Sequence, residues 1–380
     1  MELEVDDMGG LVVMGGRRIA VLGGGNGGHA IAADLSLAGF EVNMYELPAF
    51  KDKFEATLKR REIEITGKAR IGTARLRKVT TNIKEAVTDA EIIIVAVPAF
   101  GHRTFAEVCA DHLEEKQTVV LTPGTGGSLE FAKVLGKRRV ERDITLAETA
   151  TLPYGCRLTG SARVDVRIVA KILPTGVFPA KRTHNIVSDL KELYPMVIHA
   201  KNVIEAALNN ANPIVHPAGA LLNAGRIEHS KGEFYLYKEG LTPSSLKVLD
   251  AMDMERQALL KALGLKLHLC EDALDERDSV LDTTMAALFG SGSMDAGITM
   301  KGPSNLQDRY ITEDVPYGLV FMSSLGDMLN VPTPTMNSVI NIFSVINQVN
   351  YYKEGRTVEK LGIAGLSADE LNKFLDEGKF

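Results

Sequence analysis

The sequence predicts an α/β protein, in which a doubly wound sheet domain is followed by a mostly α-helical domain. Short, continuously apolar runs alternate with helix-length segments in the first half of the chain. This pattern is typical of a parallel sheet that helices cover on both faces. The strand-rich pattern stops near residue 201, and a length of 380 residues suits two domains, since one domain takes ~150 residues.

We assign the first domain to residues 17–200 and expect six strands in it. Their positions are 19–22, 41–45, 92–97, 118–122, 144–147 and 167–170. Each run ends in Gly, Pro or polar residues, and helix-length segments follow most of them, as in a doubly wound fold. The first 16 residues lack this pattern, and we expect a disordered leader there.

The second half, residues 201–380, shows helical periodicity. Residues 244–264 place apolar side chains broadly along one face, with Ser244 or Ser245 as the cap and Gly264 at the end. Residues 337–352 continue the helical pattern. No internal repeat or long linker is visible, so we expect the two domains to pack closely.

Composition and charge restrict the classes of function. Hydrophobic residues make up 45% of the chain and charged residues 24%, which is typical of a folded globular protein. The net charge of −6 argues against a nucleic-acid or anionic-membrane partner, because both attract basic surfaces. The longest apolar run, 92–97, is far shorter than the ~18 residues that span a bilayer.

Cysteine usage and the N-terminal residues indicate a cellular location. Cys109, Cys156 and Cys270 have no CxxC spacing and are too few for a disulfide framework, which favours a reducing compartment. The first ten residues carry four acidic side chains and no basic one, the opposite of a signal or transit peptide. We therefore expect a cytoplasmic protein. The sequence does not determine the oligomeric state, and a homodimer stays open.

A glycine-rich loop follows the first expected strand and precedes a helix expected over 30–38. Its glycines match G-x-G-x-x-G, in which the first permits a tight turn, the second lets backbone approach a pyrophosphate, and the third allows close helix–strand packing. The helix N-terminus adds N–H donors for an anion. A glycine-rich turn without a ligand fits this strand–loop–helix context less well. We therefore predict a Rossmann-type dinucleotide site formed by Gly23, Gly24, Gly25, Asn26, Gly27 and Gly28.

Glu46, at the end of the second strand, is expected to bind the ribose of the coenzyme. It lies 18 positions after Gly28, close to the ~20 that separate the glycine loop from a ribose-binding carboxylate. Its charge would repel the 2′-phosphate of NADP, so NAD is favoured. Four basic residues nearby leave NADP open, although a solvated helix face explains them more simply: Lys51, Lys53, Arg60 and Arg61.

Two turns at strand ends are expected to line the nicotinamide pocket, because ligands of open α/β sheets bind beyond the carboxyl ends of the strands. Pro98 follows the fourth-strand run and Pro123 follows the next one. Ordinary strand-end turns are the alternative explanation. His102, shortly after the Pro98 turn, is expected to face the same pocket and is a second-rank substrate-binding candidate.

His216 is the leading catalytic candidate, because it lies between Pro213 and Pro217 with a helical pattern directly after it. Proline suits the first turn of a helix, and the residue before a proline is disfavoured in the α region. We therefore expect His216 at a structural break, where a side chain can be aimed. A lone histidine is nevertheless more often structural.

Residues 302–318 combine three acidic side chains with one arginine in a stretch that looks like a loop. A carboxylate from this segment can orient an imidazole and support its protonated form. Arg309 can hold a substrate carboxylate through two hydrogen bonds. A surface loop with internal salt bridges explains the same composition. No metal site is predicted.

Together these motifs resemble the opine dehydrogenases. The resemblance runs from about residue 17 to the C-terminus and rests on segments 23–29, 212–217, 222–224, 312–316 and 355–362. It implies that the amine of an L-amino acid attacks a 2-oxo acid such as pyruvate, and that NAD(P)H reduces the imine to a secondary-amine dicarboxylate. It also implies that His216 and Asp314 form the catalytic pair, and that Arg309 and Asn212 bind substrate.

Two alternatives remain open. Lys201-Asn202-Val203 resembles the catalytic lysine region of glycerol-3-phosphate dehydrogenases, which favours a reductase of a phosphorylated or simple oxo substrate. An exposed residue at a helix start is the simpler explanation of Lys201. A non-enzymatic dinucleotide sensor would leave the His216 and Asp314 segments without a purpose. The sequence does not identify the amino acid or the 2-oxo acid.

Overall fold

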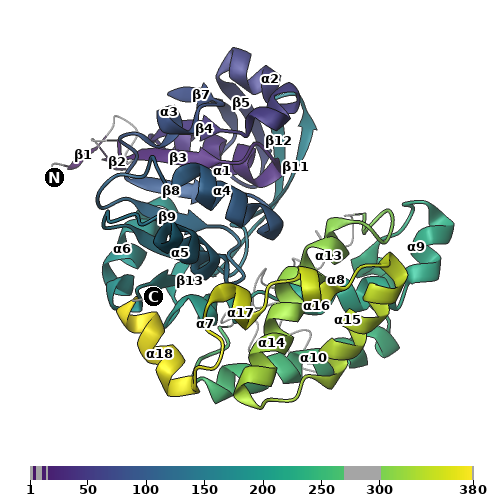
Figure 1. The fold of residues 1–380 in the computed structure, drawn as a ribbon. Coiled ribbons are helices and arrows are strands. Elements are labelled where there is room, and N and C mark those ends of the chain that lie inside the picture. The colour runs from purple at the N-terminus through teal and green to yellow at the C-terminus, as the bar shows by residue number, and fades with distance from the viewer. Residues whose placement is uncertain (1–2, 6–10, 14–15, 269–300, 379–380) are drawn as a thin grey trace.

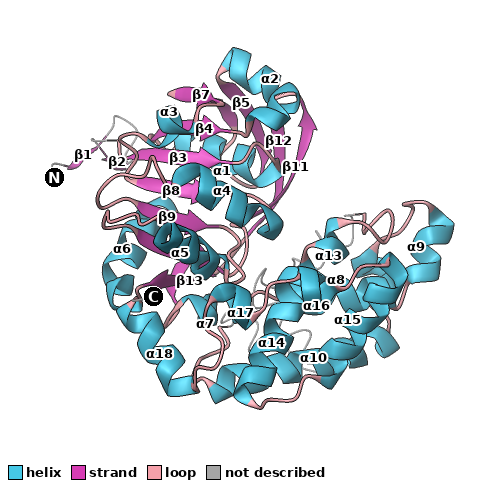
Figure 2. Ribbon diagram, in the orientation of Figure 1, coloured by secondary structure: helices cyan, strands magenta, loops and turns pink. Residues whose placement is uncertain are grey.

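The structure is a computed structural model that describes residues 3–5, 11–13, 16–268 and 301–378. Figure 1 shows two bodies, one built around sheets and one built from helices, with the chain passing from the first to the second. Figure 2 shows strands in the first body and helices throughout the second, as the sequence predicts. Among the described residues, no helix is both long enough and apolar enough to cross a membrane.

The first body contains an eight-stranded sheet in the order β14-β13-β10-β9-β8-β3-β4-β7. All neighbouring strands are parallel except β10 and β13. The strand order reverses between β3 and β8, and ligands of doubly wound sheets bind at such a point. The strands are β3 (Arg18–Leu22), β4 (Glu41–Tyr45), β7 (Lys78–Thr80), β8 (Ile92–Val95), β9 (Thr118–Leu121), β10 (Thr145–Thr149), β13 (Leu173–Phe178) and β14 (Val197–His199).

Helices cover both faces of this sheet, which explains why its strands are continuously apolar. Ala20 and Leu22 of β3 pack with the helices of one face, and Ile19 and Val21 pack with those of the other. On the first face lie α3 (Ile83–Val87), α4 (His102–Cys109) and α5 (Gly127–Lys137). On the second lie α1 (Asn26–Leu37) and α6 (Thr183–Leu193), while α2 (Lys51–Arg60) follows β4.

A second sheet of four strands packs against α1, in the order β11-β12-β5-β6. Its strands are β11 (Tyr154–Gly160), β12 (Arg163–Val169), β5 (Glu62–Gly67) and β6 (Gly72–Arg75). The prediction that the run 167–170 belongs to the main sheet is therefore wrong, because most of it lies at the end of β12. Only alternate residues of β12 are buried, as expected of a strand covered on one face.

The second body is helical, as predicted. It consists of α7 (Val203–Leu208), α8 (Asn212–Leu221), α9 (Ala224–Ser230), α10 (Pro243–Ala262), α13 (Arg309–Thr312), α14 (Val320–Leu329), α15 (Pro334–Asn347), α16 (Tyr351–Glu354), α17 (Val358–Leu361) and α18 (Ala368–Glu377). α18 returns to the sheet domain, where the Phe374 ring lies 5.5 Å from that of Phe178. We propose a domain boundary near residue 200, with α18 reaching back across it.

Several expected element ends differ from the structure. α1 begins at Asn26, four residues before the expected start. Thr242 caps α10 by accepting a hydrogen bond from the Ser245 N–H, so the cap is neither serine. The helix expected over 337–352 stops at Asn347, after which Gln348 has a left-handed backbone. The expected leader contains β1 (Leu3–Val5) and β2 (Leu11–Val13), which pair antiparallel.

Candidate active site

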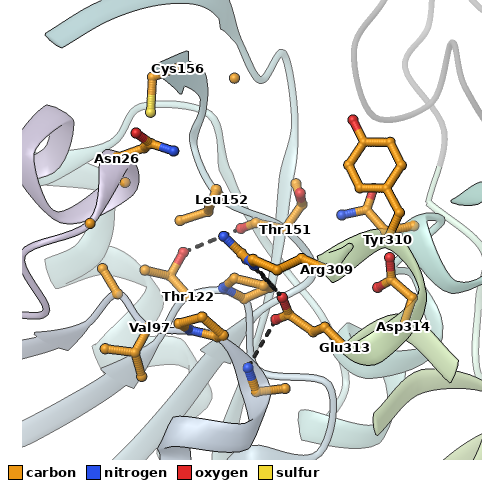
Figure 3. Close-up of a pocket in the computed structure, with 18 of the residues that line it drawn as sticks. Asn26, Val97, Thr122, Thr151, Leu152, Cys156, Arg309, Tyr310, Glu313 and Asp314 are labelled. Carbon is orange, nitrogen blue, oxygen red and sulfur yellow. Dashed lines mark hydrogen bonds and ion pairs between the residues drawn. The ribbon is translucent and has the colours of Figure 1, made fainter. Parts of the chain in front are cut away.

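A cavity of about 620 Å³ lies between the two domains. The sheet domain contributes the glycine loop, the strand-end turns after β8 and β9, and the edge formed by β11. The helical domain contributes α8 and the segment 308–318. Figure 3 labels Arg309, Tyr310, Glu313 and Asp314 of this segment. A large cleft that joins two domains and the carboxyl ends of parallel strands is a common position for an active site.

The glycine loop has the geometry of a dinucleotide site. Gly23 has a φ of +113°, and a Cβ on Gly28 would collide with the Gly23 carbonyl oxygen. A Cβ on Gly25 would meet open space, so backbone there is free to approach a pyrophosphate. The side chain of Asn26 accepts a hydrogen bond from Leu158 over 2.9 Å and links the loop to β11. The cavity lining includes Gly24, Gly25, Asn26 and Gly27.

Glu46 lies beside this loop. Its Oε2 accepts a hydrogen bond from the Gly24 N–H over 2.7 Å, and its Oε1 accepts one from the Leu47 N–H over 2.6 Å. A carboxylate next to the glycine loop is in the place where a ribose hydroxyl would be bound. Of the basic residues that follow, Lys53 lines the cavity. Lys51, Arg60 and Arg61 are exposed on or next to α2.

Both expected strand-end prolines, Pro98 and Pro123, line the cavity. The helical domain holds the backbone of the two turns that contain them. Ala99 donates its N–H to Glu313 over 2.9 Å and accepts a hydrogen bond from Arg356 over 3.2 Å. Arg356 also donates to the Thr125 carbonyl over 2.8 Å. These contacts fix the strand-end turns relative to the helical domain.

Arg356 is 2% exposed, and its charge is compensated by an ion pair with Glu130 at 2.8 Å. The guanidinium also lies over the ring of Tyr317, 5.1 Å from its centre. A buried arginine with this many partners is a strong interdomain contact, because removal would leave several buried polar groups unpaired. Arg356 lies in the segment 355–362, which resembles the opine dehydrogenases, but the sequence alone gave it no role.

The prediction that His102 faces the cavity is wrong. Its ring is fully buried, on the same face of α4 as Phe105, Ala106 and Cys109. Its Nδ1 accepts a hydrogen bond from Arg356 over 3.3 Å. Burial, with a contribution from the Arg356 charge, lowers the pKa of His102 to about 3. The ring therefore packs as a neutral side chain beneath the strand-end turns.

His216 is not at a helix break, as the sequence suggested, but inside α8. The helix begins at Asn212 with Pro213 in its first turn, and Pro217 lies within the helix. Proline has no N–H, so Pro217 cannot donate to the preceding turn, but the helix continues to Leu221. Asn212 lines the cavity, as does His216, whose exposure is only 7%.

The predicted pair of His216 and Asp314 is formed in the structure. Nδ1 of His216 lies 2.7 Å from Oδ2 of Asp314. Nε2 lies 2.9 Å from the hydroxyl of Tyr237. The ring of Tyr310 stacks on the imidazole, with centres 3.8 Å apart and planes inclined by 8°. Because a carboxylate only accepts hydrogen bonds, Nδ1 carries the hydrogen, and Nε2 is the ring nitrogen that faces the Tyr237 hydroxyl.

Arg309 also lines the cavity, but Glu313 already binds it. Nε and Nη2 of Arg309 donate to Oε2 of Glu313 over 2.9 and 2.7 Å (Figure 3). Glu313 is almost fully buried, and burial raises the pKa of its carboxyl, while Arg309 acts in the opposite direction. The Arg309 side chain is 57% exposed, so a substrate carboxylate can reach it from the cavity.

Arg157, on β11, is a further cation of the cavity beside Lys53 and Arg309, and the sequence did not single it out. It lowers the pKa of the Tyr310 hydroxyl, although burial, the largest influence, raises it. Lys201, by contrast, is exposed and does not line the cavity. Within the described ranges, no cluster of three or more His, Cys, Asp and Glu side chains is arranged to hold a metal ion.

Known proteins resemble both domains of this chain. Residues 199–347 match the family model "NAD/NADP octopine/nopaline dehydrogenase, alpha-helical domain". Residues 18–129 match "NAD-dependent glycerol-3-phosphate dehydrogenase N-terminus". A solved octopine dehydrogenase in complex with NADH and agmatine has a similar fold, with a TM-score of 0.73 and 20% identity over 96% of this chain and 99% of that one. A yersinopine dehydrogenase with NADP+ bound has a TM-score of 0.67 and 16% identity, and covers 96% and 98% of the two chains.

Curated relatives extend the match to most of the sequence. The octopine dehydrogenase of Mizuhopecten yessoensis is 23% identical over 85% of this chain and 88% of its own length. The opine dehydrogenase of Arthrobacter sp. (strain 1C) is 36% identical over 351 residues, which are 92% of this chain and 96% of the relative. The chain therefore belongs to the opine dehydrogenases, a family of NAD(P)-dependent oxidoreductases that act on a CH–NH bond.

Proposed function

We propose that this chain condenses an L-amino acid with a 2-oxo acid such as pyruvate, reduces the product with NAD(P)H to a secondary-amine dicarboxylate, and catalyses the reverse oxidation. The observation that carries the proposal is the His216–Asp314 hydrogen bond, which lies in the same cavity as the glycine loop. A dinucleotide site and a general acid–base in one cavity are the two components that this reaction needs.

His216 is the general acid and base of the reaction. Condensation needs a neutral amine to attack the 2-oxo carbon, and the carbonyl oxygen must leave as water. Nε2 of His216 takes a proton from the ammonium group and returns one to the departing oxygen, so the residue cycles between its two protonation states. Asp314 holds Nδ1 and stabilises the imidazolium by its charge over 2.7 Å. Bound NADH supplies the hydride that reduces the imine carbon.

Both substrates carry a carboxylate, which the cavity must bind. We assign one of them to Arg309, whose planar guanidinium matches a carboxylate through two hydrogen bonds. Glu313 holds two of its donors, so the substrate shares or replaces this ion pair. Asn212, at the start of α8, lines the cavity and is proposed as a further polar contact to the substrate.

The glycine loop from Gly23 to Gly28, with Glu46, Pro98 and Pro123, is proposed to bind the dinucleotide. Glu46 favours NAD, because its charge disfavours the 2′-phosphate of NADP. We further propose that the enzyme works in the cytoplasm on small molecules. The described cysteines Cys109 and Cys156 are buried free thiols, in keeping with a reducing compartment.

The proposal is tested by following the oxidation of NADH and NADPH with pyruvate and other 2-oxo acids, each combined with each common amino acid. We expect oxidation that requires both an amino acid and a 2-oxo acid, and a secondary-amine dicarboxylate in the mass spectrum of the product. Oxidation with the 2-oxo acid alone, or NAD reduction with glycerol 3-phosphate, would instead support the reductase alternative. Coenzyme binding without turnover of any pair would support a sensor.

A further inference from the structure

Tyr237 makes a direct hydrogen bond to the nitrogen through which His216 exchanges protons. Its hydroxyl lies 2.9 Å from Nε2, while Asp314 occupies the other ring nitrogen. Tyr237 also lines the cavity. Tyr237 therefore contacts His216 through its hydroxyl and also borders the cavity that holds the glycine loop.

The chain holds Tyr237 in this place by specific packing on α8. Tyr237 lies in a π-helical turn over Leu236–Gly240, a conformation frequent at functional sites. The side-chain amide of Asn223 donates to the carbonyls of Gly219 and Gly240, over 2.9 Å in each case, and so joins the turn to the helix. A Cβ on Gly219 would come within 2.7 Å of Leu236, so the turn approaches the helix closely.

The spacing of the α8 residues explains why the turn that carries Tyr237 lies beside His216. His216, Gly219 and Asn223 are three and four positions apart, which places them on one side of α8 and its C-terminal end. The side that presents His216 therefore also anchors the turn that presents Tyr237. The segment 222–224, which resembles the family in sequence, thereby gains a structural role through Asn223.

We propose that Tyr237 is a further catalytic residue of the condensation, in which its hydroxyl relays the proton between Nε2 of His216 and the substrate oxygen. The inference rests on the proposed function. When the hydroxyl of the carbinolamine leaves, its C–O bond breaks while the nitrogen lone pair forms the C=N bond. The Tyr237 O–H proton passes to the departing oxygen, so the products are water and the protonated imine. The Tyr237 oxygen takes the Nε2 proton at the same time, so His216 becomes neutral and Tyr237 ends unchanged.

The surroundings of Tyr237 suit a relay rather than a base. Burial raises its pKa well above the usual value, and the nearby Tyr310 and Asp314 act in the same direction. A free tyrosinate is therefore costly, and the phenol accepts one proton as it gives up another. The ring of Tyr310 stacks on the imidazole of His216. This stacking fixes the plane of the imidazole, so that Nε2 points toward the Tyr237 hydroxyl.

Tyr237→Phe tests the relay, with Tyr235→Phe as the matched control. Tyr235 is two positions away and does not line the cavity. General acid–base catalysis raises reaction rates about 10²–10⁴-fold. Because the relay is one part of this catalysis, we expect Tyr237→Phe to lower kcat about 10- to 100-fold. NADH affinity should be unchanged, and Tyr235→Phe should behave as wild type. Rates in H2O–D2O mixtures should indicate two transferred protons in wild type and one in Tyr237→Phe.

A wild-type kcat in Tyr237→Phe would overturn the relay. Should Tyr237→Phe lose NADH affinity through misfolding, replacement of Tyr237 by 3-fluorotyrosine keeps both ring and hydroxyl. If Tyr237 relays a proton, the fluorinated enzyme has a changed kcat and a changed pH profile of kcat. A kcat and a pH profile that both match wild type would contradict the relay. Failure of the proposed function is distinct, because wild type itself would then not oxidise NADH with any amino acid and 2-oxo acid.

Discussion

His216 and Asp314, which are 98 positions apart in the chain, are joined by a hydrogen bond of 2.7 Å. His216 comes from the middle of α8, and Asp314 begins the turn that leads into α14. Both side chains are nearly buried, with exposures of 9% and 13%, so solvent screens the pair only weakly. The carboxylate therefore holds the imidazole in one orientation, with the hydrogen on Nδ1.

We predict that Asp314→Asn lowers turnover. Asparagine carries no charge and can present an N–H to Nδ1, so the imidazole is no longer held with its hydrogen on Nδ1. The loss in the double variant with His216→Ala should be clearly less than the product of the two single losses, because both changes disable one unit. Turnover of the four proteins across pH checks this, and multiplicative losses would show that the two residues act independently.

Coenzyme preference should follow the charge of Glu46. Wild type should have the higher kcat/KM with NADH, and Glu46→Gln should narrow the difference by improving the use of NADPH. Glutamine retains an oxygen that can accept the hydrogen bond from Gly24, so this variant removes the charge and keeps the loop contact. Steady-state rates with both coenzymes decide the matter. A strong preference of wild type for NADPH would transfer the role to Lys53, which lines the cavity.

Arg309→Lys should raise the KM of one substrate markedly and leave the affinity for NADH unchanged. Lysine cannot reproduce the two parallel hydrogen bonds of a guanidinium to a carboxylate. Arg226→Lys is a matched control, because Arg226 is also paired with a glutamate, Glu239, at 3.2 Å and does not line the cavity. An Arg309→Lys enzyme with unaltered KM for both the amino acid and the 2-oxo acid removes the assignment.

His102 should make the protein less stable in acid. Its pKa is about 3 in the folded chain, against an ordinary value of 6.5. Below pH 6.5 the unfolded chain takes up a proton that the folded chain does not, so stability falls as the pH drops toward 3. The slope is at most ~1.4 kcal/mol per pH unit. His102→Asn should flatten the decrease of Tm between neutral and mildly acidic pH, whereas His199→Asn, at an exposed position, should not. Parallel slopes in wild type and His102→Asn would count against this.

Local sequence patterns predicted the central strands of the main sheet and the glycine loop, because each depends on neighbouring residues in the chain. The central strands are buried on both faces and so are continuously apolar, and the glycine loop has a fixed spacing. The second sheet was missed, because strands such as β12 carry alternating polar residues that resemble exposed segments. His102 was wrongly expected to face the cavity, because its position after the Pro98 turn does not determine which face of α4 becomes buried.

The candidate site was predicted only where residues of known chemistry stand out in the sequence. His216 and Arg309 were singled out by their types and positions, whereas Asp314 was selected among three acidic residues only by the resemblance to the opine dehydrogenases. Tyr237 has its partner 21 positions away, and Arg356 has partners more than 220 positions away. Contacts of this kind depend on how α8, its neighbouring turn and the two domains pack, and no short pattern encodes them.

The central claim, that His216 performs the acid–base step of a reductive condensation, is tested most directly by comparing His216→Ala with Lys201→Ala. Initial rates of NADH oxidation are measured with a 2-oxo acid and an amino acid together, and with the 2-oxo acid alone. We predict that His216→Ala lowers the two-substrate rate on the order of 10²–10⁴-fold while NADH still binds, and that Lys201→Ala, at an exposed position outside the cavity, behaves as wild type. A nearly normal rate in His216→Ala together with an inactive Lys201→Ala would contradict the account and establish the reductase alternative.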